Sequence, residues 1–118
     1  MGVNVMKDFP DFMKNEVNAI DSKSQSNGVK GYVYDGIDGS QMAFWTCIKE
    51  GNSDEHIHDY DEYMVVVQGQ YDVIFRDKLV EVKTGQEIYI PKGTPHAGEY
   101  INGTRTIHAF GGKRANRK

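Results

Sequence analysis

Short segments of β-forming residues, separated by tight turns, run through most of this 118-residue chain and restrict its fold more than any other feature. Many of the turns contain glycine, as in Asp35-Gly36, Gln68-Gly69 and Thr84-Gly85. Branched and aromatic side chains favour strands, and glycine supplies the positive φ that tight turns require. We expect strands at residues 29–34, 41–49, 62–67, 70–76, 79–83, 87–90 and 104–110. This series predicts a single all-β domain, either a sandwich or a barrel.

The N-terminal region has a different pattern. Its apolar residues recur at intervals of three and four: Phe9, Phe12, Met13, Val17 and Ile20. This spacing predicts a short amphipathic helix, which the polar run 21–28 ends. We therefore divide the chain into a helix and linker packed on the barrel (1–28), the barrel itself (29–112) and a basic, disordered tail (113–118).

Charge and cysteine content restrict the partners of the chain. The net charge is −3, which argues against a nucleic-acid partner. With one cysteine, Cys47, no intramolecular disulfide can form, as suits a reducing cytosol. We see neither a signal peptide nor a membrane-spanning run, so we expect a cytoplasmic protein without a membrane partner. The apolar face of the expected helix needs a cover, and we expect a homodimer.

Three of the four histidines fall in two short stretches of the chain. The first stretch places His56, His58 and Glu62 at i, i+2 and i+6, so that all three can project from one face of a strand or its bulged continuation. The second stretch ends in His96. Imidazole and carboxylate groups together bind divalent transition metals, and Fe, Mn, Ni, Zn and Cu are all possible here.

The two stretches resemble the two conserved motifs of the cupin superfamily. The motifs read Gly51-x4-His56-x-His58-x3-Glu62-x6-Gly69 and Gly85-x5-Pro91-x-Gly93-x2-His96. The first glycine is one residue closer to the histidine than is usual, and the asparagine that usually follows the second histidine is displaced. The resemblance covers residues 41–110. It implies a double-stranded β-helix (jelly-roll) barrel of the small, single-domain type, with His56, His58, Glu62 and His96 as metal ligands.

Four protein ligands on a six-coordinate metal leave positions open for a small-molecule ligand or substrate. We expect a metal-dependent enzyme of the oxygenase or the isomerase/lyase type; the alternative is a non-catalytic module that binds or senses a small ligand. His108, on the last expected strand, is a candidate catalytic residue if it faces the cavity. Arg105 has the opposite parity, so only one of these two side chains should point inward.

Overall fold

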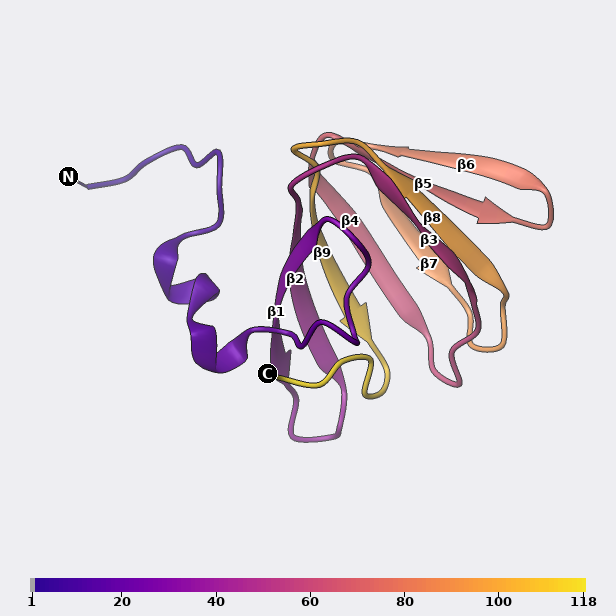
Figure 1. Cartoon of the computed structure of the whole chain (residues 1–118), viewed down its shortest axis with the longest axis horizontal. Helices are drawn as coiled ribbons and strands as arrows, with labels where there is room; N and C mark the ends of the chain where they lie inside the picture. The colour runs from indigo at the N-terminus through magenta and orange to yellow at the C-terminus, as the bar shows by residue number, and fades with distance from the viewer. Residues whose placement is uncertain (1) are drawn as a thin grey trace.

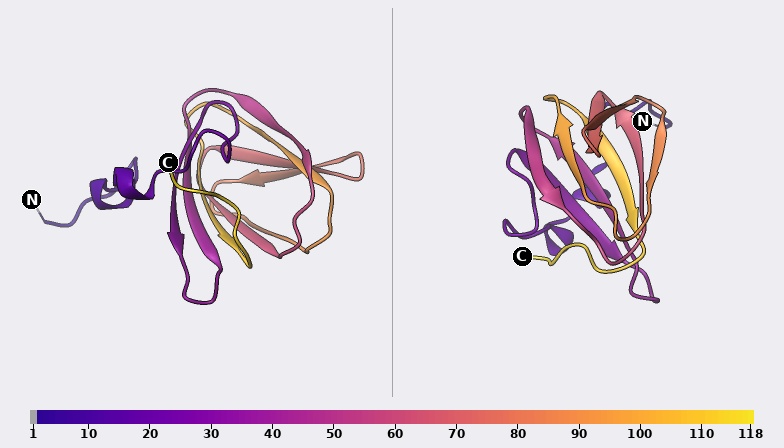
Figure 2. Two further views of the ribbon diagram at one scale, coloured as in Figure 1. Left: turned by 60° about the horizontal axis from the view of Figure 1, so that its bottom comes forward. Right: turned by 90° about the vertical axis from the view of Figure 1, so that its right-hand side faces the viewer.

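Two antiparallel sheets form the body of the protein, in a computed structural model that describes residues 2–118 (Figure 1). The first sheet has the order β1 (Val29–Asp35), β2 (Gln41–Cys47), β9 (Arg105–Phe110), β4 (Glu62–Gln68) and β7 (Glu87–Ile90). The second has the order β3 (Gly51–His56), β8 (His96–Tyr100), β5 (Gln70–Phe75) and β6 (Lys78–Lys83). Neighbouring strands are mostly far apart in sequence, as in a jelly-roll, and in Figure 2 (left) they surround a common interior.

Alternation along the strands places the core between the sheets. On β4, Glu62, Met64 and Val66 are buried, whereas Tyr63 and Val65 between them are half-buried. Successive side chains of a strand point to opposite faces, so one face of β4 lines the interior. Phe110 on β9 of the first sheet and Val73 on β5 of the second are both buried in this core. The all-β architecture expected from the sequence is therefore confirmed.

All seven expected strands are present, with ends that differ by at most two residues. Strands β3 and β8, which pair with each other, were not among these seven, although the first motif placed His56 on a strand. Strand β3 lies at the edge of its sheet, contains no apolar residue and has no buried residue. No alternation of apolar and polar residues could therefore indicate this strand.

The expected amphipathic helix at 9–20 is not formed. Two 3₁₀ turns, η1 (Asp11–Lys14) and η2 (Glu16–Asn18), occupy the segment, and Asn15 between them is extended. The Asn15 side chain accepts a hydrogen bond from the Val17 N–H, a local bond that competes with helix formation. No helix within residues 2–118 is long and apolar enough to span a membrane.

The burial of the same segment shows why its apolar spacing was misleading. Phe9 and Ile20, at its two ends, are buried, but Phe12 and Val17 are 73% and 70% exposed. The Phe9 ring packs edge-on against Phe44 of β2, with 5.8 Å between the ring centroids. The segment is thus held by its two ends and not by one apolar face.

Residues 113–118 are packed on the barrel, in contrast to the disordered tail that we expected. Ala115 is buried, and Gln41 at the start of β2 bonds to the main chain on both sides of it. Arg117 forms an ion pair with Asp35, with 2.6 Å between Nη1 and Oδ2. The basic composition of this segment predicted a solvated tail. It could not reveal these contacts, which involve the main chain and residues far away in sequence.

Candidate metal centre and its pocket

Three imidazoles converge at one end of the second sheet. His56 is the last residue of β3 and His96 the first of β8, and the antiparallel pairing places these two residues opposite each other. His58 follows in the loop after β3. One ring nitrogen from each of His56, His58 and His96 lies within 4.8 Å of the others.

Glu62 reaches the same point from the other sheet. Its Oε1 lies 3.4 Å from His58 Nε2 and 3.6 Å from His96 Nε2. We expected His56, His58 and Glu62 on one strand or its continuation. Instead β3 ends at His56, the chain crosses over between 57 and 61, and Glu62 opens β4. The structure thus brings the four residues together at the junction of the two sheets.

Main-chain carbonyls orient two of the imidazoles. The Nδ1 of His56 lies 2.8 Å from the Asp54 carbonyl, and the Nδ1 of His96 lies 2.8 Å from the Thr94 carbonyl. A carbonyl can only accept a hydrogen bond, so each Nδ1 carries the proton and each Nε2 keeps a free lone pair. This is the arrangement of a metal-binding histidine with an oriented second nitrogen.

Unsatisfied polar atoms mark the centre of the cluster. Within residues 2–118, five buried side-chain nitrogen or oxygen atoms have no hydrogen-bond partner, and three of them are His58 Nε2, Glu62 Oε1 and His96 Nε2. Buried polar atoms without partners are costly and call for an explanation. A divalent cation coordinated by imidazole nitrogen and carboxylate oxygen would satisfy all three, so the residues present fit such an ion.

The pKa values suit metal binding. Burial opposes ionisation of Glu62, but the hydrogen bond from His108 and the contacts with His58 and His96 outweigh it and hold the pKa of Glu62 well below its usual range. Burial lowers the pKa of His56, so this imidazole is neutral near pH 7. For His96, burial lowers the pKa, but the Glu62 carboxylate and the hydrogen bond to the Thr94 carbonyl together outweigh burial and raise the pKa. A cation would thus meet an ionised carboxylate and imidazole lone pairs.

His108 faces the interior, and it lies directly behind Glu62. Its Nδ1 lies 3.1 Å from Glu62 Oε2, and its Nε2 lies 2.9 Å from the Thr106 hydroxyl. Nδ1 therefore donates to the carboxylate, and the Thr106 hydroxyl donates to Nε2. His108 does not line the pocket that leads to the imidazoles or the cavity beside Glu62 and His96. This placement suits a residue that positions Glu62 more than one that touches a substrate.

Arg105, the competing candidate, points to the other face of the sheet. Its Nε donates to Gln68 Oε1 at 3.2 Å, and its guanidinium lies over the Phe9 ring, 4.8 Å from the centroid. The parity argument for His108 and Arg105 is therefore correct, and His108 is the one inside. Cys47 is buried, and burial raises the pKa of its thiol to about 12.

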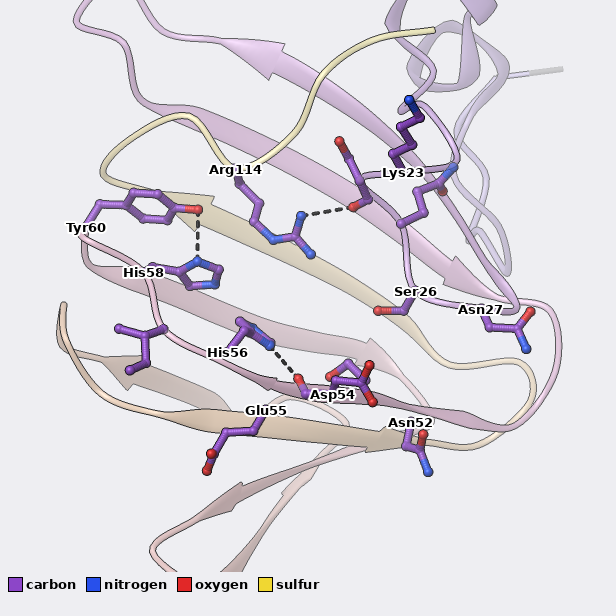
Figure 3. A pocket seen from close by; sticks show the side chains of 14 residues that line it. Lys23, Ser26, Asn27, Asn52, Asp54, Glu55, His56, His58, Tyr60 and Arg114 are labelled. Carbon is purple, nitrogen blue, oxygen red and sulfur yellow. Dashed lines mark hydrogen bonds between the residues drawn. The ribbon is translucent and has the colours of Figure 1, made fainter.

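An open pocket of about 600 Å³ leads to the imidazoles, as Figure 3 shows. It is lined by Lys23, Ser24, Gln25, Ser26, Asn27, Asn52, Ser53, Asp54, Glu55, His56, Ile57, His58, Tyr60 and Arg114. A smaller cavity of about 20 Å³ lies deeper and is lined by residues that include Glu62 and His96. His56 and Arg114 line both, so the pocket gives access to the cluster.

Sequence reasoning missed Tyr60 and Arg114. The Tyr60 hydroxyl lies 3.1 Å from His58 Nδ1, and the two rings are stacked with 4.8 Å between centroids. Arg114 had been assigned to the tail. The only sequence signal was Gly111-Gly112, which allows the chain to turn after β9. A Cβ on Gly112 would lie 2.6 Å from Tyr60 Cδ2, so only glycine fits against this ring.

Comparison with known proteins agrees with the fold and the motifs. The sequence matches the Cupin_2 family of cupin domains over residues 44–109. No functionally curated protein matches it. Among solved structures, an RmlC-like cupin from Shewanella frigidimarina NCIMB 400 has a TM-score of 0.70 at 17% identity, covering 84% of this chain and 86% of that chain. The structure of KdgF from Halomonas sp. has a TM-score of 0.67 at 17% identity, covering 85% and 86%.

A cupin-2 domain protein from Shewanella frigidimarina NCIMB 400 is 25% identical, with a TM-score of 0.57 and coverage of 70% of this chain and 79% of that chain. These likenesses establish the architecture, and the family match spans more than half of the sequence. Together with the two sheets and the histidine cluster, they show that this chain belongs to the Cupin_2 family, as a small member of the cupin superfamily.

Proposed function

We propose that this protein is a metal-dependent enzyme that acts on a small, polar organic molecule. The observation that carries the proposal is the convergence of unpartnered His58 Nε2, His96 Nε2 and Glu62 Oε1 beside an open pocket. A structural metal site is usually closed by its protein ligands, whereas a catalytic site keeps an accessible side. Here His56 and His58 line the pocket itself, which supports a ligand-binding role.

Each residue of the site has a definite task in this proposal. His56, His58, His96 and Glu62 hold the cation, which when bound supplies Lewis-acid polarisation of a substrate oxygen. The carbonyls of Asp54 and Thr94 keep two imidazoles oriented, and His108 does the same for Glu62. Burial raises the pKa of Tyr60 to about 12, so its hydroxyl stays protonated and is available as a hydrogen-bond donor.

The pocket lining favours a Lewis-acid reaction, of the isomerase or lyase type, over an oxygenase that takes flat aromatic substrates. Hydroxyl and amide side chains predominate around the opening, among them Ser26, Asn27 and Asn52. Such groups hydrogen-bond to a hydrated, oxygen-rich molecule. They offer little apolar surface to an aromatic ring, which usually binds among hydrophobic and aromatic side chains.

The second candidate function is ligand binding without turnover. It is favoured by the character of Tyr60, whose raised pKa makes it unsuitable as a general base near pH 7. Asp54 and Glu55 also line the pocket, but both are exposed to solvent, which does not favour a role in proton transfer. A sensing or carrier module would need the same cation and pocket but no proton-transfer group.

Elemental analysis and turnover assays test the proposal together. We expect His58→Ala to reduce bound metal about tenfold or more, while Glu55→Gln, which changes a neighbouring acid outside the cluster, leaves it unchanged. Full metal retention by His58→Ala would show that the ligand set is wrong. Metal-dependent turnover of hydroxylated substrates without O₂ would support the isomerase or lyase class. O₂ consumption would instead indicate an oxygenase, and tight binding without turnover would indicate the second function.

A further inference from the structure

The C-terminal segment delivers one cationic side chain into the pocket. Arg114 lies half-buried between the histidine cluster and the 23–27 loop, as Figure 3 shows. Its Nη1 donates to the Ser24 carbonyl at 2.9 Å, and its guanidinium lies over the Trp45 ring, 5.4 Å from the centroid. The same side chain lines both the open pocket and the deeper cavity beside Glu62 and His96.

The charge of Arg114 is not neutralised by the protein. Among residues 2–118 no carboxylate lies within ion-pair distance of its guanidinium. Asp54 and Glu55 line the pocket, but neither forms an ion pair with Arg114. A guanidinium has five N–H donors, and only one of them has a partner within the described part of the chain. The others are available to a ligand in the pocket.

The main chain holds Arg114 in place. Its backbone N–H donates to Gln41 Oε1 at 2.7 Å, and the N–H of Ala115 donates to the same oxygen at 3.0 Å. Gln41 and Ala115 are both buried. The guanidinium is therefore carried by an anchored segment and not by a free end, so little entropy is lost when it binds an anion.

We propose that Arg114 is a specificity-determining residue that pairs with a carboxylate, and that the pocket takes a small hydroxylated organic acid. A guanidinium binds a carboxylate bidentately through two parallel N–H···O bonds. The hydroxyl and amide side chains of Ser26, Asn27 and Asn52 match the remaining hydroxyl groups of such an acid. The inference rests on the proposed function in that this acid would be the substrate held at the metal centre.

Calorimetric titration with D-gluconate tests this inference, with D-glucitol as the uncharged counterpart that carries the same kind of hydroxyl groups. The proteins are the wild type, Arg114→Gln, Arg114→Lys and Lys113→Gln, each with and without metal, and metal content is measured in the same samples. Lys113 is the neighbouring cation, exposed and outside this pocket, and serves as the matched control.

We expect Arg114→Gln to weaken gluconate binding about tenfold or more, Arg114→Lys to weaken it less, and Lys113→Gln to leave it unchanged. Metal content should be the same in all four proteins. Thermal unfolding shows whether Arg114→Gln folds. If it does not, the comparison of Arg114→Lys with the wild type decides, because lysine keeps the charge but cannot bind a carboxylate bidentately.

Several results would overturn the inference. These are no gluconate binding by the wild type, equal gluconate affinity in Arg114→Gln and the wild type, or equal affinity for gluconate and glucitol. Inorganic phosphate that binds more tightly than gluconate and requires Arg114 would replace the carboxylate with a phosphate ligand. Arg114-dependent gluconate binding by a wild type that holds no metal would refute the metal-dependent function but leave this inference standing.

Discussion

In two imidazoles of the candidate metal centre, Nδ1 carries the proton because it donates to the carbonyl two residues earlier in the chain. His56 bonds to the Asp54 carbonyl and His96 to the Thr94 carbonyl, in both cases through Nδ1. The free Nε2 atoms are thereby directed to the shared centre. The residue types are visible in the sequence, but the local bends that bring these carbonyls to the rings are visible only in the structure.

His108 is expected to act on metal affinity through Glu62. It is 1% exposed and donates from Nδ1 to Glu62 Oε2, which leaves Oε1 free to coordinate a cation. Replacing His108 with Leu should weaken metal binding by about 10- to 100-fold, because partners behind a metal ligand orient it. His108→Gln can still donate and should restore part of the affinity. The measurement is a competition titration with a chromophoric chelator; equal affinity in His108→Leu and the wild type would contradict the role.

Gly98 on β8 is required for close packing against Tyr71 of β5. A Cβ at this position would lie 2.6 Å from Tyr71 Cζ and would also contact the hydroxyl oxygen. Gly98→Ala should lower the free energy of unfolding by about 1–3 kcal/mol, because the ring has to move within a packed core. Urea denaturation measures the difference. Gly111→Ala, where the added atom meets nothing closer than 3.5 Å, is the control and should change it by less than about 0.5 kcal/mol.

Among the secondary structure elements, the strands rich in apolar side chains were predictable, whereas β3 and β8 were not. Strands such as β2 and β4 are largely buried and therefore carry apolar side chains, which the sequence shows directly. Strands β3 and β8 instead carry His56 and His96 at their ends. The β3 sequence, which has no apolar residue, is polar along its whole length, so no periodicity could reveal it.

The C-terminal segment 113–118 behaves as an element in its own right because Gln41 binds it. The Gln41 Oε1 accepts from Arg114 and Ala115, and its Nε2 donates to the Ala115 carbonyl at 3.1 Å. Gln41→Leu leaves these main-chain groups without partners, so we expect a loss of about 2 kcal/mol or more in the free energy of unfolding. Hydrogen exchange at 114–116 should also become faster.

A matched control for this element is Gln70→Leu. The Gln70 side chain is only half-buried and bonds to Asp72 and Glu81 near the surface, so its loss should cost less than about 1 kcal/mol. Equal effects of the Gln41 and Gln70 substitutions in urea denaturation would show that Gln41 does not anchor the segment.

At the scale of the whole molecule, acid should release the metal. Burial lowers the pKa of His96, but Glu62 and the hydrogen bond to the Thr94 carbonyl together raise it, so protons compete for this imidazole as the pH falls. The pKa of Glu62 is lowered, so the carboxylate keeps its charge in this range. Since protons and metal compete for imidazole, release should occur at about pH 6.5 or somewhat below. Dialysis followed by elemental analysis measures it, and metal retained to about pH 4 would contradict imidazole ligation.

The homodimer expected from the sequence stays a prediction, and its basis has changed with the structure. The apolar helix face does not exist, yet Phe12 and Val17 are exposed on the 3₁₀ turns beside β1. Sedimentation equilibrium should give twice the chain mass of 13.3 kDa. Phe12→Ser should then shift the protein toward the monomer. A wild type of single-chain mass at high concentration would refute the prediction.

The sequence by itself determined the all-β architecture and the four candidate metal-binding residues, because alternation, turn residues and histidine spacing are local properties of the chain. Only the tertiary structure decided how His56, His58, Glu62 and His96 meet, since β3 and β4 belong to different sheets. It also decided that His108 faces inward and that Arg114 enters the pocket. These placements depend on strand pairing and on main-chain bonds between residues far apart in sequence, such as the 41–115 contact, which no local pattern encodes.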